Sequence, residues 1–350
     1  MLSIDSGSSI SKENQNGKNY VSFLHRHHLK WVNMARFRFD PISGKFNLTG
    51  IKCGDDTPPP PLPDQLVEIT GGDLVYDYTD ELGAKWRVYE CLGTTALTCL
   101  SPGRVQALVA GGGGGGGAHS TNNPPPETIP GSGAGGGGLY VFEKDIEVDS
   151  HVAEIGSGGA TGNPNSSVDD ANGRNGRKGS PSLFLGVSSD GGAGGQGVST
   201  QNANKNGASG AGQAQPSLGP FGLGEKYFGN DGGTGSDGGQ GSAFRAPGGG
   251  GGAGTKGGDG IAGVKSGDAG HGVNLGWFFG VAERWLCCGS AGGRNFRGST
   301  QMPAGDPAPG GTEHGQSATP NTGNAGSSCG AQIVGTAGAS GIVAVRYRIA

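Results

Sequence analysis

The sequence predicts a mainly β protein, in which an antiparallel sheet or sandwich is joined to a glycine-rich core of extended, polyproline-II-like segments with long loops. Short apolar runs of period two follow one another between residues 66 and 110, which is typical of antiparallel strands. Glycine then dominates, with 78 of 350 residues. Such a composition also fits low complexity, but apolar and aromatic runs recur between the glycine blocks, and a linker does not need them. We therefore expect a folded chain.

The stretch from Leu108 to Gly138 shows how strands and glycine blocks join. Its apolar beginning leads into seven consecutive glycines, Gly111 to Gly117, and a polar insert, Ala118 to Pro130, separates these from a second block. Glycine loses much backbone entropy on folding and buries almost no apolar surface. A folded block must therefore be stabilised by backbone hydrogen bonds and Cα–H···O contacts between close chains. Polyproline-II helices packed side by side meet that requirement, whereas collagen is excluded because no strict Gly-X-Y period holds.

Residues 1–55 are expected to form a small N-terminal β arm that anchors the protein. The run MARFRFDPISGKFNLTG, which begins at Met34, predicts strand, turn and strand. It resembles the opening of many small phage tail proteins, which makes Met34 a candidate natural start and residues 1–33 a candidate upstream extension. The anchoring candidates in this run are Arg36, Phe37, Phe39 and Phe46. Residues 56–65 are rich in proline and predict a stiff linker to the body, residues 66–350.

The body begins with five predicted strands. They cover residues 67–70, 74–78, 86–91, 96–100 and 105–110 and are separated by turns that contain Gly, Asp or Pro. Their alternation of apolar and polar residues indicates an antiparallel sheet or sandwich. Much later, Trp277, Phe278, Phe279 and Trp285 form a dense aromatic cluster. It either packs against the sheet as core or offers ring faces on which sugars stack.

A family resemblance rests on several runs in a fixed order. WRVYECLGTTALTCLSPGRVQALVAGGGGGGG resembles the entry hairpins of the glycine-rich domain found in bacteriophage tail fibres and minor tail proteins. SPSLFLGVSSDGGAGGQG, ATPNTGNAGSSCG and the closing GASGIVAVRYRIA agree with later parts of that domain. The resemblance covers residues 66–350. The chain departs from the pattern at Cys287, Cys288 and Cys329, where glycine or alanine is usual.

The resemblance implies a structural phage tail component, of fibre or minor tail type, that attaches to the virion by its N-terminal region and displays the glycine-rich domain for host-surface recognition. One alternative is a purely architectural virion decoration, or a collar or baseplate protein without receptor binding; another is a polysaccharide depolymerase. The implied partners are other virion tail proteins and a host cell-surface glycan or protein. A homotrimer is a further expectation. The implied location is the virion tail, with synthesis in the host cytoplasm and no signal peptide.

Polar segments between the glycine blocks are the candidates for host contact, because recognition usually resides in loops on a rigid scaffold. These segments are 118–130, 163–178, 201–228 and 295–320; mobile connectors are the alternative interpretation. The candidate receptor-contact residues are His119, Asn122, Asn123, Asn163, Asn165, Tyr227, Phe228, Asn295, Phe296, Arg297 and His314.

The sequence predicts no enzyme and no catalytic, cofactor-binding or metal-binding residue. GxGxxG matches are expected by chance in a chain this rich in glycine, and none opens a helix in a βαβ pattern. A depolymerase would need paired carboxylates. The available pairs are Asp169 with Asp170 and Glu143 with Asp145. Because the members of each pair are close in sequence, we interpret them as ordinary surface residues.

Charge, hydropathy and cysteine spacing narrow the choice of partners further. The formal net charge of −4 is too mild to indicate a nucleic-acid partner, and the apolar runs are too short to span a membrane. The six cysteines match no zinc spacing. We expect free, packed thiols, with a bridge from Cys329 to Cys287 or Cys288 as the exception.

Overall fold

The structure is a computed structural model that consists of two compact units, Met1–Pro63 and Asp64–Ala350. It describes residues 10–15, 18–23, 38–40, 45–47, 67–118, 127–128, 130–163, 174–197, 205–214, 222, 224, 229–237, 245–297, 300–328 and 335–349. The division between the two units falls within the proline-rich residues 56–65.

The first unit contains two short hairpins. Strand β1 (Ile10–Gln15) pairs with β2 (Lys18–Phe23), and β3 (Arg38–Asp40) pairs with β4 (Lys45–Asn47). The second hairpin is the predicted strand, turn and strand, with Phe39 opposite Phe46. The first hairpin was not predicted, because its polar sequence shows no apolar alternation.

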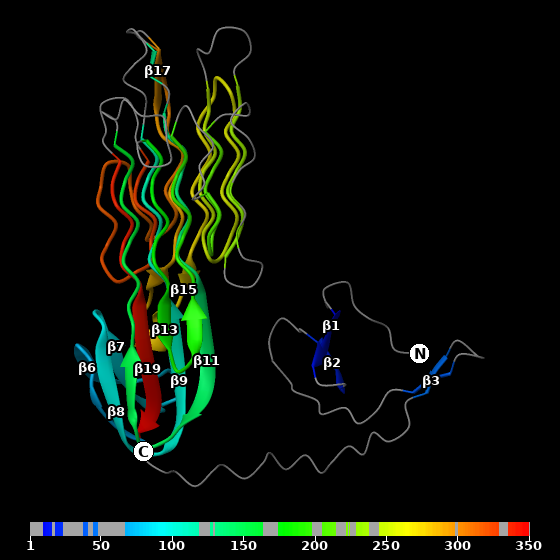
Figure 1. Cartoon of the computed structure of the whole chain (residues 1–350), viewed down its shortest axis with the longest axis vertical. Helices are drawn as coiled ribbons and strands as arrows, with labels where there is room; N and C mark the ends of the chain where they lie inside the picture. Colours follow the sequence, from blue (N-terminus) through cyan, green and yellow to red (C-terminus); the bar gives the residue numbers. More distant parts are fainter. Residues whose placement is uncertain are drawn as a thin grey trace. The chain divides into compact units, whose positions relative to one another are not determined.

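A five-stranded antiparallel sheet is the base of the second unit (Figure 1). Its order is β11-β9-β19-β7-β6. The strands are β6 (Leu74–Thr79), β7 (Lys85–Cys91), β9 (Gly103–Ala110), β11 (Leu139–Ile146) and β19 (Ile342–Ile349). The closing strand, β19, lies between β7 and β9, so the two ends of the glycine-rich region meet in the middle of one sheet.

A second sheet packs on one face of the first and completes the predicted sandwich. It has the order β12-β8-β5, with β5 (Glu68–Gly71), β8 (Thr95–Ser101) and β12 (Ser150–Ala153). Alternate residues of β9 and β19 point into the space between the sheets, as the period of two predicts. The buried core there includes Ile69, Tyr89, Leu97, Val105, Ala107, Val109, Ile146, Val343, Val345 and Tyr347.

The opposite face of the five-stranded sheet is covered by a short insert. It consists of β15 (Val273–Asn274), helix α1 (Gly276–Phe279) and β16 (Trp285–Leu286). Phe278 and Phe279 are buried there against the sheet, whereas Trp277 remains 55% exposed. Of the two interpretations of the aromatic cluster, core packing therefore holds for both phenylalanines.

The glycine blocks form a bundle of extended segments above the sandwich, as Figure 1 shows. The segment 111–117 lies at the centre of six neighbours. Its N–H groups donate in turn to three of them: Gly111, Gly112 and Gly113 to Gly138, Ser180 and Ala339 (2.9–3.0 Å), then Gly114, Gly115 and Gly116 to Gly135, Arg177 and Thr336 (2.9–3.1 Å). Its carbonyls accept from the other three, around residues 159–162, 192–195 and 326.

This repeat of three residues identifies polyproline-II geometry, because that helix has three residues per turn and no internal hydrogen bonds. A β-strand offers hydrogen bonds to two sides only, whereas here each residue of a turn addresses a different neighbour. The segments must pack so closely that a Cβ on Gly115 would lie 2.0 Å from the carbonyl oxygen of Ala160. The prediction of a glycine-rich core built from polyproline-II-like segments is confirmed.

The sheet and the bundle are continuous. Strands β9, β11 and β19 are neighbours in the sheet, and their extensions 111–117, 131–138 and 335–341 are neighbours in the bundle. Strands β13 (Ser182–Phe184) and β14 (Val187–Ser189) likewise form a hairpin between two bundle segments. The sandwich thus holds one end of the bundle, and the glycine segments extend away from it to the other end (Figure 1).

Candidate functional site

The end of the bundle away from the sandwich, here called the distal end, gathers residues that flank several of the polar segments. Ala118 N donates to Arg174 O (2.8 Å), which joins the start of segment 118–130 to the end of segment 163–178. The buried Gln196 joins two more neighbours: its carbonyl oxygen accepts from Ser132 N (2.9 Å) and its Oε1 from Ala214 N (3.0 Å). Segments far apart in the chain therefore enter and leave the bundle at one place.

A small sheet at the distal end brings two candidate segments into direct contact. It has the order β10-β17-β18, formed by β10 (Glu127–Thr128), β17 (Asn295–Arg297) and β18 (Thr300–Met302). Glu127 lies opposite Arg297, and Thr128 opposite Phe296. Figure 1 shows β17 at the far end of the bundle from the sandwich. Residues 127–128 and 295–302 are thus parts of one feature.

The predicted contact residues fall into three groups. Asn295, Phe296 and Arg297 make up β17 at the distal end, and Asn163 is exposed at the end of a bundle segment. His314 lies elsewhere, on the flank of the bundle. Six contact candidates and two anchoring candidates lie outside the described residues: His119, Asn122, Asn123, Asn165, Tyr227, Phe228, Arg36 and Phe37.

Two of the polar segments are not loops throughout. Within 201–228, residues 205–214 form a bundle segment in which Ala208 and Ala211 are fully buried. Within 295–320, Ala308 and Thr312 are buried against the bundle. Their small side chains fit at the periphery of the glycine lattice, which explains why a segment that is polar in composition packs as part of the body.

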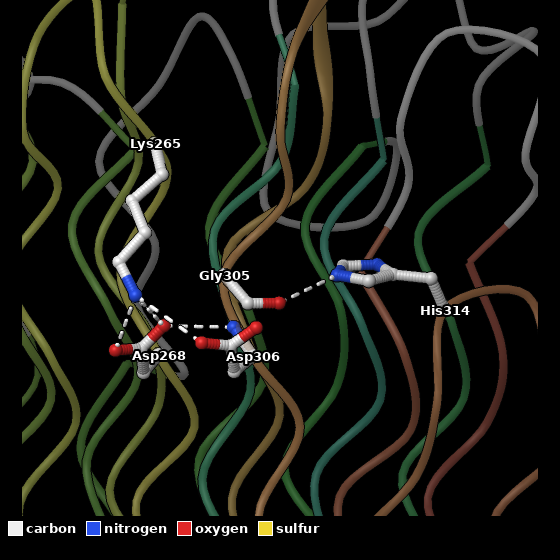
Figure 2. A network of polar contacts seen from close by, with 5 residues as sticks. All are labelled: Lys265, Asp268, Gly305, Asp306 and His314. Atoms are coloured by element: carbon white, nitrogen blue, oxygen red, sulfur yellow. Dashed lines mark hydrogen bonds and ion pairs between the residues drawn. The ribbon is translucent and has the colours of Figure 1, made fainter.

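A charged network on the flank of the bundle lies to one side of His314, which contacts it through the Gly305 carbonyl (Figure 2). Lys265 Nζ lies 2.8 Å from both carboxylate oxygens of Asp268 and 3.3 Å from Asp306 Oδ2. The hydrogen bond to Asp268 raises the pKa of Lys265. His314 Nε2 lies 3.3 Å from Gly305 O, and burial lowers the pKa of its ring. The ammonium group bridges the two carboxylates, so the network ties two peripheral segments together.

The carboxylates considered for catalysis are held by partners. Arg104 forms two hydrogen bonds with Asp145 (2.9 and 3.2 Å), and Gln106 donates to Glu143 (2.8 Å); Asp169 and Asp170 lie outside the described residues. Across the described part of the chain, no group of three or more His, Cys, Asp or Glu side chains could hold a metal ion. No helix that the structure describes has the length and apolar character needed to cross a membrane.

The thiols are packed and protonated. Among the described residues, the free, buried cysteines are Cys91, Cys99, Cys287 and Cys288. Burial raises the pKa of each thiol, to about 12 for Cys91 and to about 11 for Cys288. Cys287 Sγ lies 3.3 Å from Gly138 O, where it contacts a carbonyl of the glycine block. The prediction of free thiols is confirmed for these four, and Cys53 and Cys329 lie outside the described residues.

The sequence did not predict one further cluster, a hollow on the sandwich between the β6–β7 turn and α1. There Trp277 contacts Tyr78 and Arg346, which lie near opposite ends of the sequence of the body. The only signal for it in the sequence was the aromatic cluster that contains Trp277, for which sugar stacking was one of the two interpretations.

Comparison with known proteins gives a family. A family model described as a glycine-rich domain matches residues 90–348. A search of curated proteins found no match. The matched region begins at the end of β7 and extends into β19, so it contains the whole bundle and the later strands of the sandwich, whereas β5 and β6 precede it. The chain therefore belongs to the glycine-rich domain family.

Proposed function

We propose that the protein is a structural phage tail component, of fibre or minor tail type, whose glycine-rich body contacts the host surface through its distal end. One observation carries the proposal: residues that flank separate polar segments converge at the end of the bundle away from the sandwich, where β10 and β17 pair. The resemblance of the chain to phage tail domains supports the tail context.

The architecture suits the display of a contact surface. Each residue from Gly111 to Gly116 donates a hydrogen bond to a neighbouring segment, so the polar segments begin and end on backbone that is fixed by its neighbours. Loops held in this way lose less entropy when they bind. A weak contact by each copy would be multiplied by avidity on a particle that carries several copies.

The same proposal assigns roles to the remaining parts. The N-terminal unit, with Phe39 and Phe46 paired in its second hairpin, attaches the body to other tail proteins, and the protein is located in the virion tail. The partner at the distal end is a host cell-surface glycan or protein. A homotrimer would place three distal ends side by side.

Adsorption of particles that carry substituted protein tests the contact surface. The distal variant replaces Asn295, Phe296 and Arg297 with alanine. The control variant replaces three exposed residues of the sandwich with alanine: Thr70, Leu100 and Val148. We expect the distal variant to reduce the adsorption rate while the control adsorbs like the parent. Immunogold labelling of both particles confirms that the protein is present.

Equal adsorption of the distal variant and the parent, with equal labelling, would contradict host recognition by β17. That result would favour an architectural role. Absence of label from parental particles would contradict the tail context itself.

A further inference from the structure

The hollow on the sandwich has a volume of about 430 Å³, which lies within the range of small-molecule sites. It is lined by the β6–β7 turn (residues 78–82), by Trp277 and the turn that follows α1 (residues 280–282), and by Arg346 of β19. Three parts of the chain that are remote in sequence therefore form its walls. It lies on the sandwich and is separate from the distal end.

A buried arginine provides the polar group of the hollow. Arg346 is only 5% exposed. Its Nε donates to Gln106 Oε1 (2.7 Å), and its Nη1 donates to Trp277 O (2.8 Å) and to the Tyr78 hydroxyl. Its Nη2 has no hydrogen-bond partner among the described residues. Because Arg346 lines the hollow, this nitrogen is a donor that a ligand can use.

An aromatic wall stands beside this donor. The guanidinium carbon of Arg346 lies 4.2 Å from the ring centre of Trp86 and 4.5 Å from that of Trp277, so one face of Trp277 rests on the cation. The Tyr78 hydroxyl donates to Trp277 O (2.9 Å) and fixes α1 against β6. More than half of Trp277 nevertheless remains exposed. A rigidly held indole with open surface is a stacking platform for an apolar ring face.

The rim of the hollow supplies the opposite charge. Glu81 is exposed, and it makes no hydrogen bond to any other residue that the structure describes. Asp80 is already engaged: its Oδ1 accepts from Leu82 N and Ala84 N (3.0 and 2.9 Å), and its Oδ2 from Trp86 Nε1 (2.9 Å). The hollow therefore offers a donor on Arg346 and an acceptor on Glu81.

We propose that this hollow binds a neutral pyranose ring of a glycan. The C–H face of a pyranose stacks on an indole, and its hydroxyls both donate and accept, which suits Glu81 and Arg346 together. An acidic sugar would be repelled by Glu81 and Asp80, and an amino sugar with a free ammonium would be repelled by Arg346. Neutral hydroxyls can accept a hydrogen bond from Arg346 and donate one to Glu81 without charge repulsion. The inference does not depend on recognition at the distal end.

Titration of the full-length protein with methyl glycosides of glucose, galactose and mannose tests the proposal. The readout is the indole N–H signal of Trp277 by NMR, assigned with the Trp277→Phe variant. We expect saturable shifts with at least one glycoside. Glu81→Gln, which alters an exposed side chain, should weaken that binding by about tenfold, because a charged hydrogen bond is lost. Glu147→Gln, on an exposed turn of the sandwich, is the matched control and should bind like the parent.

Two results would overturn the proposal. One is the absence of any shift of the Trp277 signal with all three glycosides at about 50 mM, a concentration that would saturate a site with a Kd of about 1 mM. The other is equal affinity in the parent and Glu81→Gln. Because the signal reports binding at the sandwich, either failure leaves adsorption through the distal end unaffected.

Discussion

Replacement of Gly114 by valine tests whether the glycine block is a packed core. A Cβ at this position would lie 1.9 Å from Ala193 O and 2.5 Å from Ala193 C, and Cβ atoms in proteins essentially never come within 3.0 Å of such atoms. The obstacle is backbone, so it cannot rotate away as a flexible side chain could. The segments 111–117 and 190–197 must therefore separate.

The cost follows from the contacts that separation breaks. Overpacking of a filled interior costs about 1–3 kcal/mol. Two hydrogen bonds join these segments: Gly112 O accepts from Gly192 N (2.8 Å), and Gly115 O accepts from Gly195 N (2.9 Å). Each such bond contributes about 1 kcal/mol. We expect the free energy of unfolding to fall by about 3–5 kcal/mol, a large part of the usual stability of a domain.

Urea unfolding followed by tryptophan fluorescence measures this change. Gly93→Val is the matched control, because a Cβ on Gly93 has no atom within 4 Å, and its unfolding midpoint should stay near that of the parent. A Gly114→Val protein as stable as the parent would refute the reasoning, since the block would then be a linker.

Three further predictions concern buried polar groups. Burial lowers the pKa of His314, so the unfolded state takes up the proton first as pH falls below about 6.5. The free energy of unfolding should therefore decrease below that pH, and it should decrease less in the His314→Gln variant. An identical pH profile for the two proteins would contradict this expectation. Glu90 is buried and accepts two hydrogen bonds from Arg284 (2.7 and 2.9 Å). Glu90→Gln should lower the free energy of unfolding by about 2 kcal/mol, and should lower it less when Arg284 is already replaced by methionine. An additive double-mutant cycle would argue against coupling of the two residues. Iodoacetamide at pH 8 should not modify four buried thiols in the native protein: Cys91, Cys99, Cys287 and Cys288. Peptide mass mapping detects the modification. Rapid labelling of any of these thiols in the native protein would contradict its burial.

The sandwich could be predicted from the sequence because its strands carry side-chain information. Residues 67–110 alternate apolar and polar positions, and β5 to β9 lie within one or two residues of the predicted ranges. The pairing of β19 between β7 and β9 could not be predicted in the same way, because residues 342–349 are separated from those strands by more than two hundred residues and no local pattern records the contact.

The bundle could be predicted in kind and not in detail. Composition required close-packed backbone, but a run such as Gly111 to Gly117 has no side chain that distinguishes one register or one neighbour from another. The segment 205–214 was expected to be a loop for a related reason: its small alanine and serine residues fill peripheral positions of the lattice, and they also look like a linker.

The candidate site shows the same division. Polar segments between glycine blocks could be found in the sequence, and Asn295 to Arg297 do lie at the distal end. The pairing of β10 with β17 and the position of His314 on the flank depend on the order of segments in the bundle. The hollow at Trp277 could not be predicted, because it forms where Tyr78 and Arg346 lie close together, and the sheet topology alone brings them there.

Amide hydrogen exchange at Gly111 to Gly116 tests the central claim most directly, that this block is the hydrogen-bonded centre of the body. These six amides donate in turn to three neighbouring segments, at 2.9–3.1 Å. We predict that all six exchange as slowly as the amides of β9 and β19, since they open only when the body unfolds. Exchange at the rate of an unstructured chain would contradict the claim.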